Sequence, residues 1–133
     1  MIYLDACVVI YWVEEHSVYA PCIEQWVLKA APAPLAISPL TMTEALVLPY
    51  RQNHIALIQK YEAFFANSLI LPLTDAVFIN AARLRANHSG LKTPDALHLA
   101  TAQYHGCSSL WTNDNRLERT MQGYTVNVCE RKL

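Results

Sequence analysis

Short apolar runs alternate with segments of helical periodicity along the whole chain. Apolar runs of a few residues predict strands, whereas apolar residues spaced three and four apart predict helices. Strands separated by helices need crossover connections, which favour a parallel sheet with helices on its faces. The sequence therefore predicts an α/β fold. The predicted strands are 2–4, 35–37, 69–71, 109–111 and 124–128, and the predicted helices are 6–15, 18–30, 41–51, 54–66, 75–87 and 94–105.

Capping residues and prolines mark several of these boundaries. Thr93 before Pro94 is a good helix start, and Gly106 after His105 is a good helix stop. Pro49 is predicted to end or kink the third helix, because proline removes a backbone donor. The 133 residues contain no internal repeat or linker, so we expect a single domain spanning residues 1–133.

Composition and charge exclude several classes of protein. The chain is 53% hydrophobic and 16% charged, which excludes disorder. A net charge of −1 gives the whole chain no general affinity for nucleic acid, so any basic surface is local. The four cysteines form no C-x-x-C pair, and no segment is typical of a signal peptide or a membrane span. We expect a cytoplasmic protein with reduced thiols and no membrane contact.

Four carboxylates stand beside predicted strand ends or helix starts: Asp5, Glu44, Asp95 and Asp114. Asp5 lies inside a nearly continuous apolar stretch, where an isolated carboxylate is costly unless it is paired or bound to metal. Ligands of open parallel sheets bind outside the carboxyl ends of the strands, where all four side chains can meet. Mg²⁺ and Mn²⁺ prefer oxygen ligands and lower the pKa of bound water, which suits phosphodiester hydrolysis.

Each acid also has a purely structural interpretation. Asp5 can cap the helix that follows it, and Asp114 can serve as a turn residue. Asp95 after Pro94 is a natural first-turn acid, favoured by the helix dipole. Glu44 can be a solvated helix residue. The joint order and placement of the four acids favour a shared site.

Four segments of the sequence, which include the four acids, resemble the PIN domain, and in particular the VapC class of toxin ribonucleases from type II toxin–antitoxin pairs. The resemblance covers nearly the whole chain, and residues 91–102 (LKTPDALHLATA) are its most specific segment. The other matching segments are residues 2–5 (IYLD), 43–44 (TE) and 110–114 (LWTND).

The resemblance implies a three-layer domain with a central five-stranded parallel sheet flanked by helices. It also implies an Mg²⁺- or Mn²⁺-dependent endoribonuclease, with Asp5, Glu44, Asp95 and Asp114 as catalytic metal ligands. Thr112 and Asn113 match the polar pair that orients bound water or the last acid. A cognate antitoxin and a homodimer are the implied partners, besides RNA. The sequence departs from the family at Ala6, where the hydroxyl residue that often follows the first acid is missing.

Other residues near the acids have less specific interpretations. Arg116, two residues after Asp114, is our choice for a phosphate contact, although any one of the surrounding cations fits solvated surface charge. His98 is read as a packed or capping residue rather than a general acid. Aromatic residues of the first two helices fit either the core or a dimer or antitoxin surface. These aromatics are Tyr11, Trp12, Tyr19 and Trp26.

Rival functions differ in the acids that they need. An aspartyl-phosphate phosphatase needs a second acid at the position of Cys7, and a response-regulator receiver needs a paired acidic start. Neither pattern is present. A catalytically weak or inactive PIN-like module that binds RNA or protein is the remaining alternative, and Ala6 is the residue that favours it.

Overall fold

The computed structural model describes residues 1–133, and its centre is a five-stranded, fully parallel sheet. The strand order is β3-β2-β1-β4-β5, so the most buried strand, β1, pairs with β2 on one side and with β4 on the other. The strands are β1 (Ile2–Leu4), β2 (Leu35–Ile37), β3 (Leu69–Ile70), β4 (Ser109–Thr112) and β5 (Thr125–Asn127).

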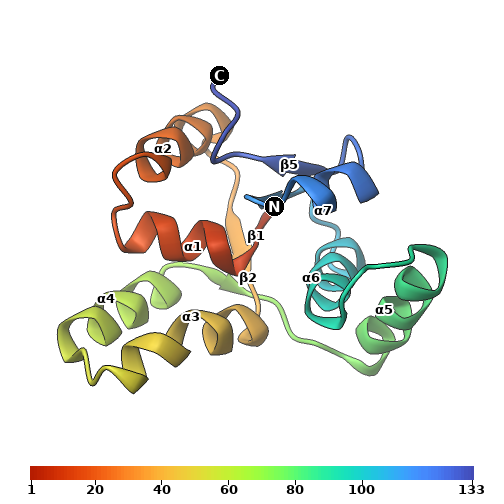
Figure 1. Ribbon diagram of the computed structural model, residues 1–133, viewed down its shortest axis with the longest axis horizontal. Coiled ribbons are helices and arrows are strands. Elements are labelled where there is room, and N and C mark those ends of the chain that lie inside the picture. Colours follow the sequence, from red (N-terminus) through yellow and green to blue (C-terminus); the bar gives the residue numbers. More distant parts are fainter.

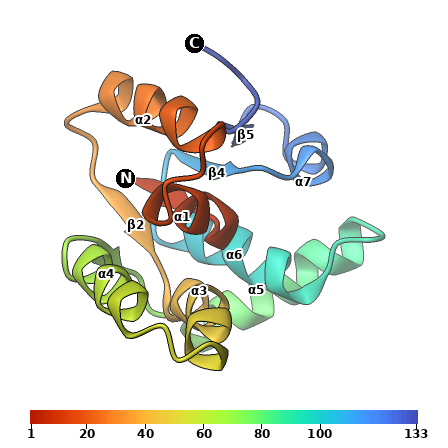
Figure 2. The same cartoon turned by 60° about the vertical axis from the view of Figure 1, so that its left-hand side comes forward.

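Helices cover both faces of this sheet. Figure 1 shows α1 to α4 on one side of β1 and β2, with α5 and α6 on the other, and Figure 2 shows the same division from a second direction. The short helix α7 lies beside β5. The helices are α1 (Ala6–Val13), α2 (Tyr19–Ala30), α3 (Pro39–Arg51), α4 (Ile55–Ala66), α5 (Asp75–Asn87), α6 (Thr93–Tyr104) and α7 (Asn115–Thr120).

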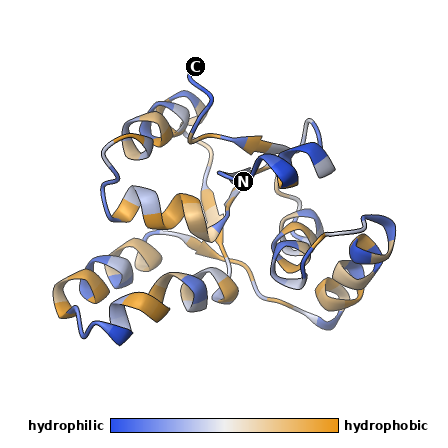
Figure 3. Ribbon diagram, viewed as in Figure 1, coloured by the Kyte–Doolittle hydropathy of each residue, from blue (hydrophilic) through white to orange (hydrophobic).

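Alternate residues of the strands enter two separate cores. In β1, Ile2 and Leu4 pack with α1 to α4, whereas Tyr3 between them packs with α5 and α6. In β4, Trp111 joins the first core and Leu110 the second. This division follows from the two-residue period of a strand. Figure 3 shows the strands and α1 as predominantly hydrophobic, as expected for elements buried between layers.

The structure confirms the α/β prediction, with shifts at several boundaries. The helix predicted to start at residue 41 begins at Pro39, because proline fits the first helical position, where no backbone donor is needed. Pro49 does not end this helix, which continues for two more residues to Arg51; proline there removes a single backbone donor, close to the end of the helix. Helix α7 was not predicted at all, since Leu117 is its sole buried residue and leaves no apolar period to detect.

The strand order creates a crevice at the carboxyl end of the sheet. The chain moves from β1 to β2 and β3 on one side, then returns to place β4 on the other side of β1. Such a reversal between neighbouring strands is where open α/β sheets bind their ligands. Asp5 directly follows β1 and Asp114 follows β4 by two residues, so both acids flank this crevice.

Two further findings bear on the sequence predictions. All four cysteines are free thiols in this structure. None of its helices combines the length and the apolar character required to cross a membrane.

Candidate active site

The four predicted acids line a single cavity of about 540 Å³. They come from four parts of the fold: the end of β1, the middle of α3, the first turn of α6 and the loop after β4. Much of the remaining wall comes from α1, through Ala6, Cys7, Ile10 and Tyr11. The fold therefore brings together acids that are far apart in the sequence. They are Asp5, Glu44, Asp95 and Asp114.

Asp5 is the most buried of the four, with 8% of its surface exposed. One carboxylate oxygen accepts a hydrogen bond from the Ala6 amide at 2.8 Å, so Asp5 also caps α1. The other accepts from the Thr112 hydroxyl at 2.8 Å. A hydroxyl therefore reaches Asp5 from β4, although Ala6 itself supplies none. The Cys7 thiol lies 3.6 Å from this second oxygen, and burial followed by the Asp5 charge raises its pKa, which keeps it a neutral donor.

Thr112 connects two of the acids. Its hydroxyl donates to Asp5 and accepts from the Asp114 amide at 3.1 Å, while the Asp114 carboxylate caps α7 through the amides of Arg116 and Leu117. The neighbouring Asn113 also lines the cavity, and its side-chain oxygen is buried without a hydrogen-bond partner. Buried oxygens without partners are uncommon and point to a missing donor or cation.

Glu44 is held by a residue that sequence reasoning placed in the packing. The Nε2 atom of His98 lies 2.5 Å from Glu44 Oε1 and 3.8 Å from Asp5 Oδ1. His98 is 1% exposed, so the prediction of a packed residue was correct, yet the same ring contacts two of the acids. The spacing Asp95-x-x-His98 places His98 near Asp95 on one helix, but no spacing in the sequence signals its contacts with Glu44 and Asp5.

The other nitrogen of His98 meets Tyr3, which sequence reasoning missed. Tyr3 Oη lies 2.6 Å from Nδ1 of His98 and donates to the Ser38 hydroxyl at 2.8 Å. Since a tyrosine hydroxyl has one proton, Nδ1 donates to Tyr3 while Nε2 donates to Glu44. Burial opposes the resulting positive charge, but the hydrogen bond to Glu44 and the charges of Asp5 and Asp95 outweigh it and raise the pKa of His98.

Repulsion between the acids appears at Asp95. Its carboxylate has no hydrogen-bond donor within the protein, and burial followed by the charges of Asp5 and Asp114 raises its pKa. A helix dipole favours an acid in this first turn. Burial and the like charges nevertheless outweigh it, and like charges in close proximity are expected of carboxylates that share a cation site.

The donor set fits a hard divalent cation that keeps part of its water. The cavity offers the carboxylate oxygens of the four acids, and the unpartnered amide oxygen of Asn113 is buried beside it. No three Asp, Glu, His or Cys side chains are close enough to form a ready-made metal cluster. Glu44 is turned toward His98, and Asp114 toward the amides of α7. Magnesium typically binds one or two carboxylates directly and retains several waters, so a spread set of acids suits it.

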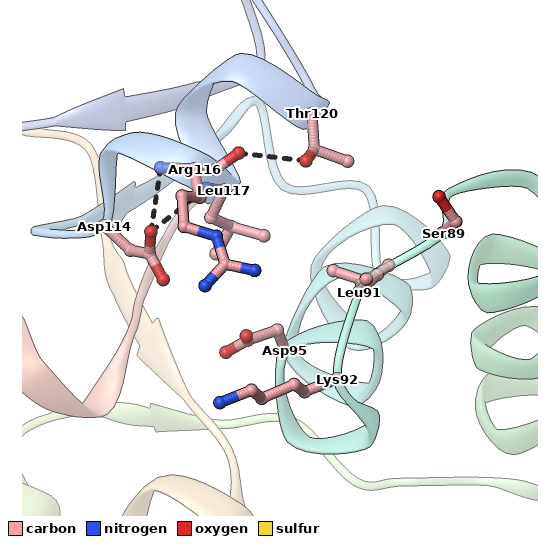
Figure 4. Close-up of a pocket in the computed structure, with 9 residues that line it drawn as sticks. Ser89, Leu91, Lys92, Asp95, Asp114, Arg116, Leu117 and Thr120 are labelled. Atoms are coloured by element: carbon pink, nitrogen blue, oxygen red, sulfur yellow. Dashed lines mark hydrogen bonds between the residues drawn. The ribbon is translucent and has the colours of Figure 1, made fainter.

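A second, smaller cavity of about 140 Å³ adjoins the first and shares Asp95, Asp114 and Arg116 with it. Figure 4 shows the carboxylate of Asp95 between the side chains of Arg116, from α7, and Lys92, at the start of α6. Neither cation forms an ion pair within the protein. Both are exposed, so they are available to an anionic ligand that approaches the acids.

Sequence comparison decides the family. The sequence model of the PIN-domain family matches residues 2–121 of this chain. The chain belongs to the PIN-domain family. No curated protein sequence matches it. The expected PIN-like fold, with its five-stranded parallel sheet, is thereby confirmed.

Solved structures share this PIN fold over nearly their whole length. A toxin–antitoxin complex from Klebsiella pneumoniae is 22% identical, with all of both chains covered and a TM-score of 0.79. VapBC2 from Rickettsia felis, bound to a promoter DNA fragment, is 19% identical, with 96% of this chain and 98% of that chain covered and a TM-score of 0.78. VapC20 from Mycobacterium tuberculosis, a sarcin-ricin loop cleaving toxin, is 14% identical, with 93% and 96% covered and a TM-score of 0.74.

Proposed function

We propose that this PIN domain is a divalent-metal-dependent endoribonuclease and the toxin of a type II toxin–antitoxin pair. The observation that carries the proposal is the convergence of Asp5, Glu44, Asp95 and Asp114 on one cavity at the strand-order reversal of the sheet. His98 is the only protein group that forms an ion pair with these acids, and it pairs with Asp5 and Glu44 but not with Asp95 or Asp114. A divalent ion would balance the remaining charge.

The acids take different roles around that ion. Asp5 and Asp95 would hold it directly, and Glu44 and Asp114 directly or through water. Bound Mg²⁺ or Mn²⁺ supplies positive charge to phosphate oxygens and lowers the pKa of coordinated water. Thr112 fixes the carboxylate of Asp5 and the backbone of Asp114, while Asn113 lines the same cavity.

Arg116 and Lys92 would guide the RNA backbone. Phosphate contacts position a nucleic acid without reading its sequence, and arginine and lysine supply them. Both cations lie at the border of the acidic cavity, without a carboxylate partner. They could therefore neutralise phosphates next to the one that is cut, on a chain whose net charge is −1.

The toxin assignment rests on relatives rather than on the cavity. The similar structures include a toxin–antitoxin complex from Klebsiella pneumoniae and VapBC2 from Rickettsia felis. We propose an antitoxin as the protein partner of this chain and a homodimer as its assembly. Co-expression with the product of an adjacent small gene tests the first, because a cognate antitoxin should co-purify and suppress RNA cleavage. Light scattering tests the second.

The nuclease proposal is tested with purified protein, freed of any co-purifying partner, and end-labelled RNA. Internal cleavage is expected with Mg²⁺ or Mn²⁺ and none in EDTA, with activity returning when metal is restored. Cleavage that persists unchanged in EDTA would contradict a metal-dependent mechanism. A folded protein that binds RNA but never cuts it would favour the inactive binding module instead.

Arg116→Ala should weaken RNA binding more than the chemical step. Loss of one phosphate contact reduces the slope of log affinity against log salt by about 1. The Arg116 amide that Asp114 accepts from is backbone, so the substitution leaves that cap in place. Filter binding across a salt series, together with KM and kcat, measures the effect.

Arg119→Ala is the matched control for Arg116. It removes the same charge from the same helix, but Arg119 lines a different cavity, away from the acids. Equal changes in the salt slope for both variants would indicate a general charge effect and would remove Arg116 from the binding surface.

A further inference from the structure

One buried chain of hydrogen bonds joins the three elements that carry three of the acids. Tyr3 lies on β1, two residues before Asp5, and His98 lies on α6, three residues after Asp95. His98 bonds to Glu44 on α3, and Tyr3 bonds to Ser38, the residue that caps α3. Tyr3 and His98 therefore lie within three residues of Asp5 and Asp95, and Glu44 is itself bonded to the chain. The chain fixes the spacing of β1, α3 and α6 where the acids meet.

The direction of each bond leaves His98 no alternative partner. The Glu44 carboxylate has no proton to give, so Nε2 of His98 donates to it over 2.5 Å. Nδ1 faces Tyr3 at 2.6 Å, and the Tyr3 ring packs against the imidazole with centroids 5.5 Å apart. Both ring nitrogens are occupied and the side chain is 1% exposed. The ring is consequently held in one orientation.

Glu44 depends on this contact for its position. Its side chain is 36% exposed, and His98 is the one protein group to which it hydrogen-bonds. A glutamate on an exposed helix surface has many rotamers, and fixing it in one orientation costs conformational entropy. The buried imidazole selects the rotamer that faces Asp5, whose Oδ1 lies 3.8 Å from the same Nε2.

We infer that His98, held by Tyr3, is the positioning residue that aims Glu44 into the cation site of this domain. The inference rests on the proposed metal-dependent function, and it assigns no contact between His98 and substrate. Residues that orient ligands in this way typically change metal affinity by about 10–100-fold.

Two substitutions of His98 distinguish the roles of its two ring nitrogens. An asparagine amide can replace the Nδ1 donor toward Tyr3 but does not reach Glu44, whereas a glutamine amide can replace the Nε2 donor toward Glu44. His98→Asn should lower the affinity for Mn²⁺ by about 10–100-fold, and His98→Gln should retain most of it. Titration calorimetry of Mn²⁺ into each protein measures this affinity without any RNA.

Both substitutions replace the imidazole by a neutral amide, which makes the comparison decisive. If His98 acted only as a positive charge near the acids, the Asn and Gln variants would bind Mn²⁺ equally. Both would also bind it more tightly than the wild type, because a competing positive charge is gone. Equal affinities would therefore overturn the inference.

A pair of buried tyrosines provides a test that leaves charge unchanged. Tyr3 and Tyr61 are both fully buried, and each hydroxyl donates one hydrogen bond, to Ser38 and to Glu14 respectively. Tyr3→Phe should weaken Mn²⁺ binding, while Tyr61→Phe, outside the site, should leave it unaltered. Thermal unfolding of both variants separates loss of stability from loss of affinity.

The outcomes distinguish this inference from the proposed function. Equal Mn²⁺ affinities for Tyr3→Phe and Tyr61→Phe would contradict positioning even if His98→Asn failed to fold. Wild-type protein that binds no Mn²⁺ would contradict the metal-dependent function itself, and the positioning role would fall with it.

Discussion

Asp5→Asn is expected to lower metal-dependent RNA cleavage by more than about 100-fold while preserving the fold. Residues that only orient a ligand account for about 10–100-fold, so loss of a charged ligand should exceed that range. The asparagine oxygen can still accept from the Ala6 amide, and its NH₂ group can face the Thr112 hydroxyl. Cleavage rates at saturating Mn²⁺ and circular dichroism of the same preparation measure the two effects.

Asp75→Asn serves as the control for this loss. Asp75 is an exposed acid in the first turn of α5 and lines neither cavity of the site. It should cleave RNA as the wild type does. An Asp5→Asn variant that cuts at the rate of the control would exclude Asp5 from the catalytic site.

Asp95→Asn is expected to change activity and stability in opposite directions. Cleavage should again fall by more than about 100-fold. Burial and the charges of Asp5 and Asp114 raise the pKa of Asp95 in the folded protein, so its ionised form destabilises the metal-free fold. The carboxylate also makes no hydrogen bond that the asparagine would lose. The variant should therefore have a higher Tm than the wild type at neutral pH in EDTA.

The pH dependence of that difference carries a definite sign. A carboxyl group whose pKa is higher in the folded than in the unfolded protein destabilises the fold when the pH is above the folded pKa. The destabilisation disappears when the pH falls below the unfolded pKa. The gap in Tm between Asp95→Asn and wild type should be largest near neutral pH and shrink as the solution is acidified. Calorimetry in EDTA across this range checks it. A neutral-pH Tm at or below that of the wild type would show that the acids do not repel one another at Asp95.

Local patterns in the sequence were sufficient to predict most of the strands and helices. The five strands alternate with helices as their apolar runs indicate, and α5 has the predicted limits, 75–87. Helix α7 was not predicted, because its N-cap, Asp114, was already explained as a ligand or turn residue. In addition, six residues with one buried side chain show no helical periodicity. Asp114 caps that helix and faces the cavity as well, so both interpretations apply to one residue.

The site was predictable as a set of acids but not as a network. Strand ends and helix starts placed Asp5, Glu44, Asp95 and Asp114 at one edge of the sheet, because parallel strands share their carboxyl end. The bond between Tyr3 and His98 joins residues 95 positions apart, and it depends on which face of β1 points toward α6. Side-chain partners of this kind follow from tertiary packing rather than from spacing along the chain.

Anomalous diffraction from crystals soaked in Mn²⁺ tests the central claim most directly, because it locates the ion without reference to activity. The proposed site predicts a manganese peak in the cavity lined by the four acids, with oxygen atoms of Asp5 and Asp95 among its ligands. Soaked crystals of Asp5→Asn should show a weaker peak or none. A well-occupied manganese elsewhere, with the acids still spread and the cavity free of metal, would contradict the claim that these carboxylates form one cation site.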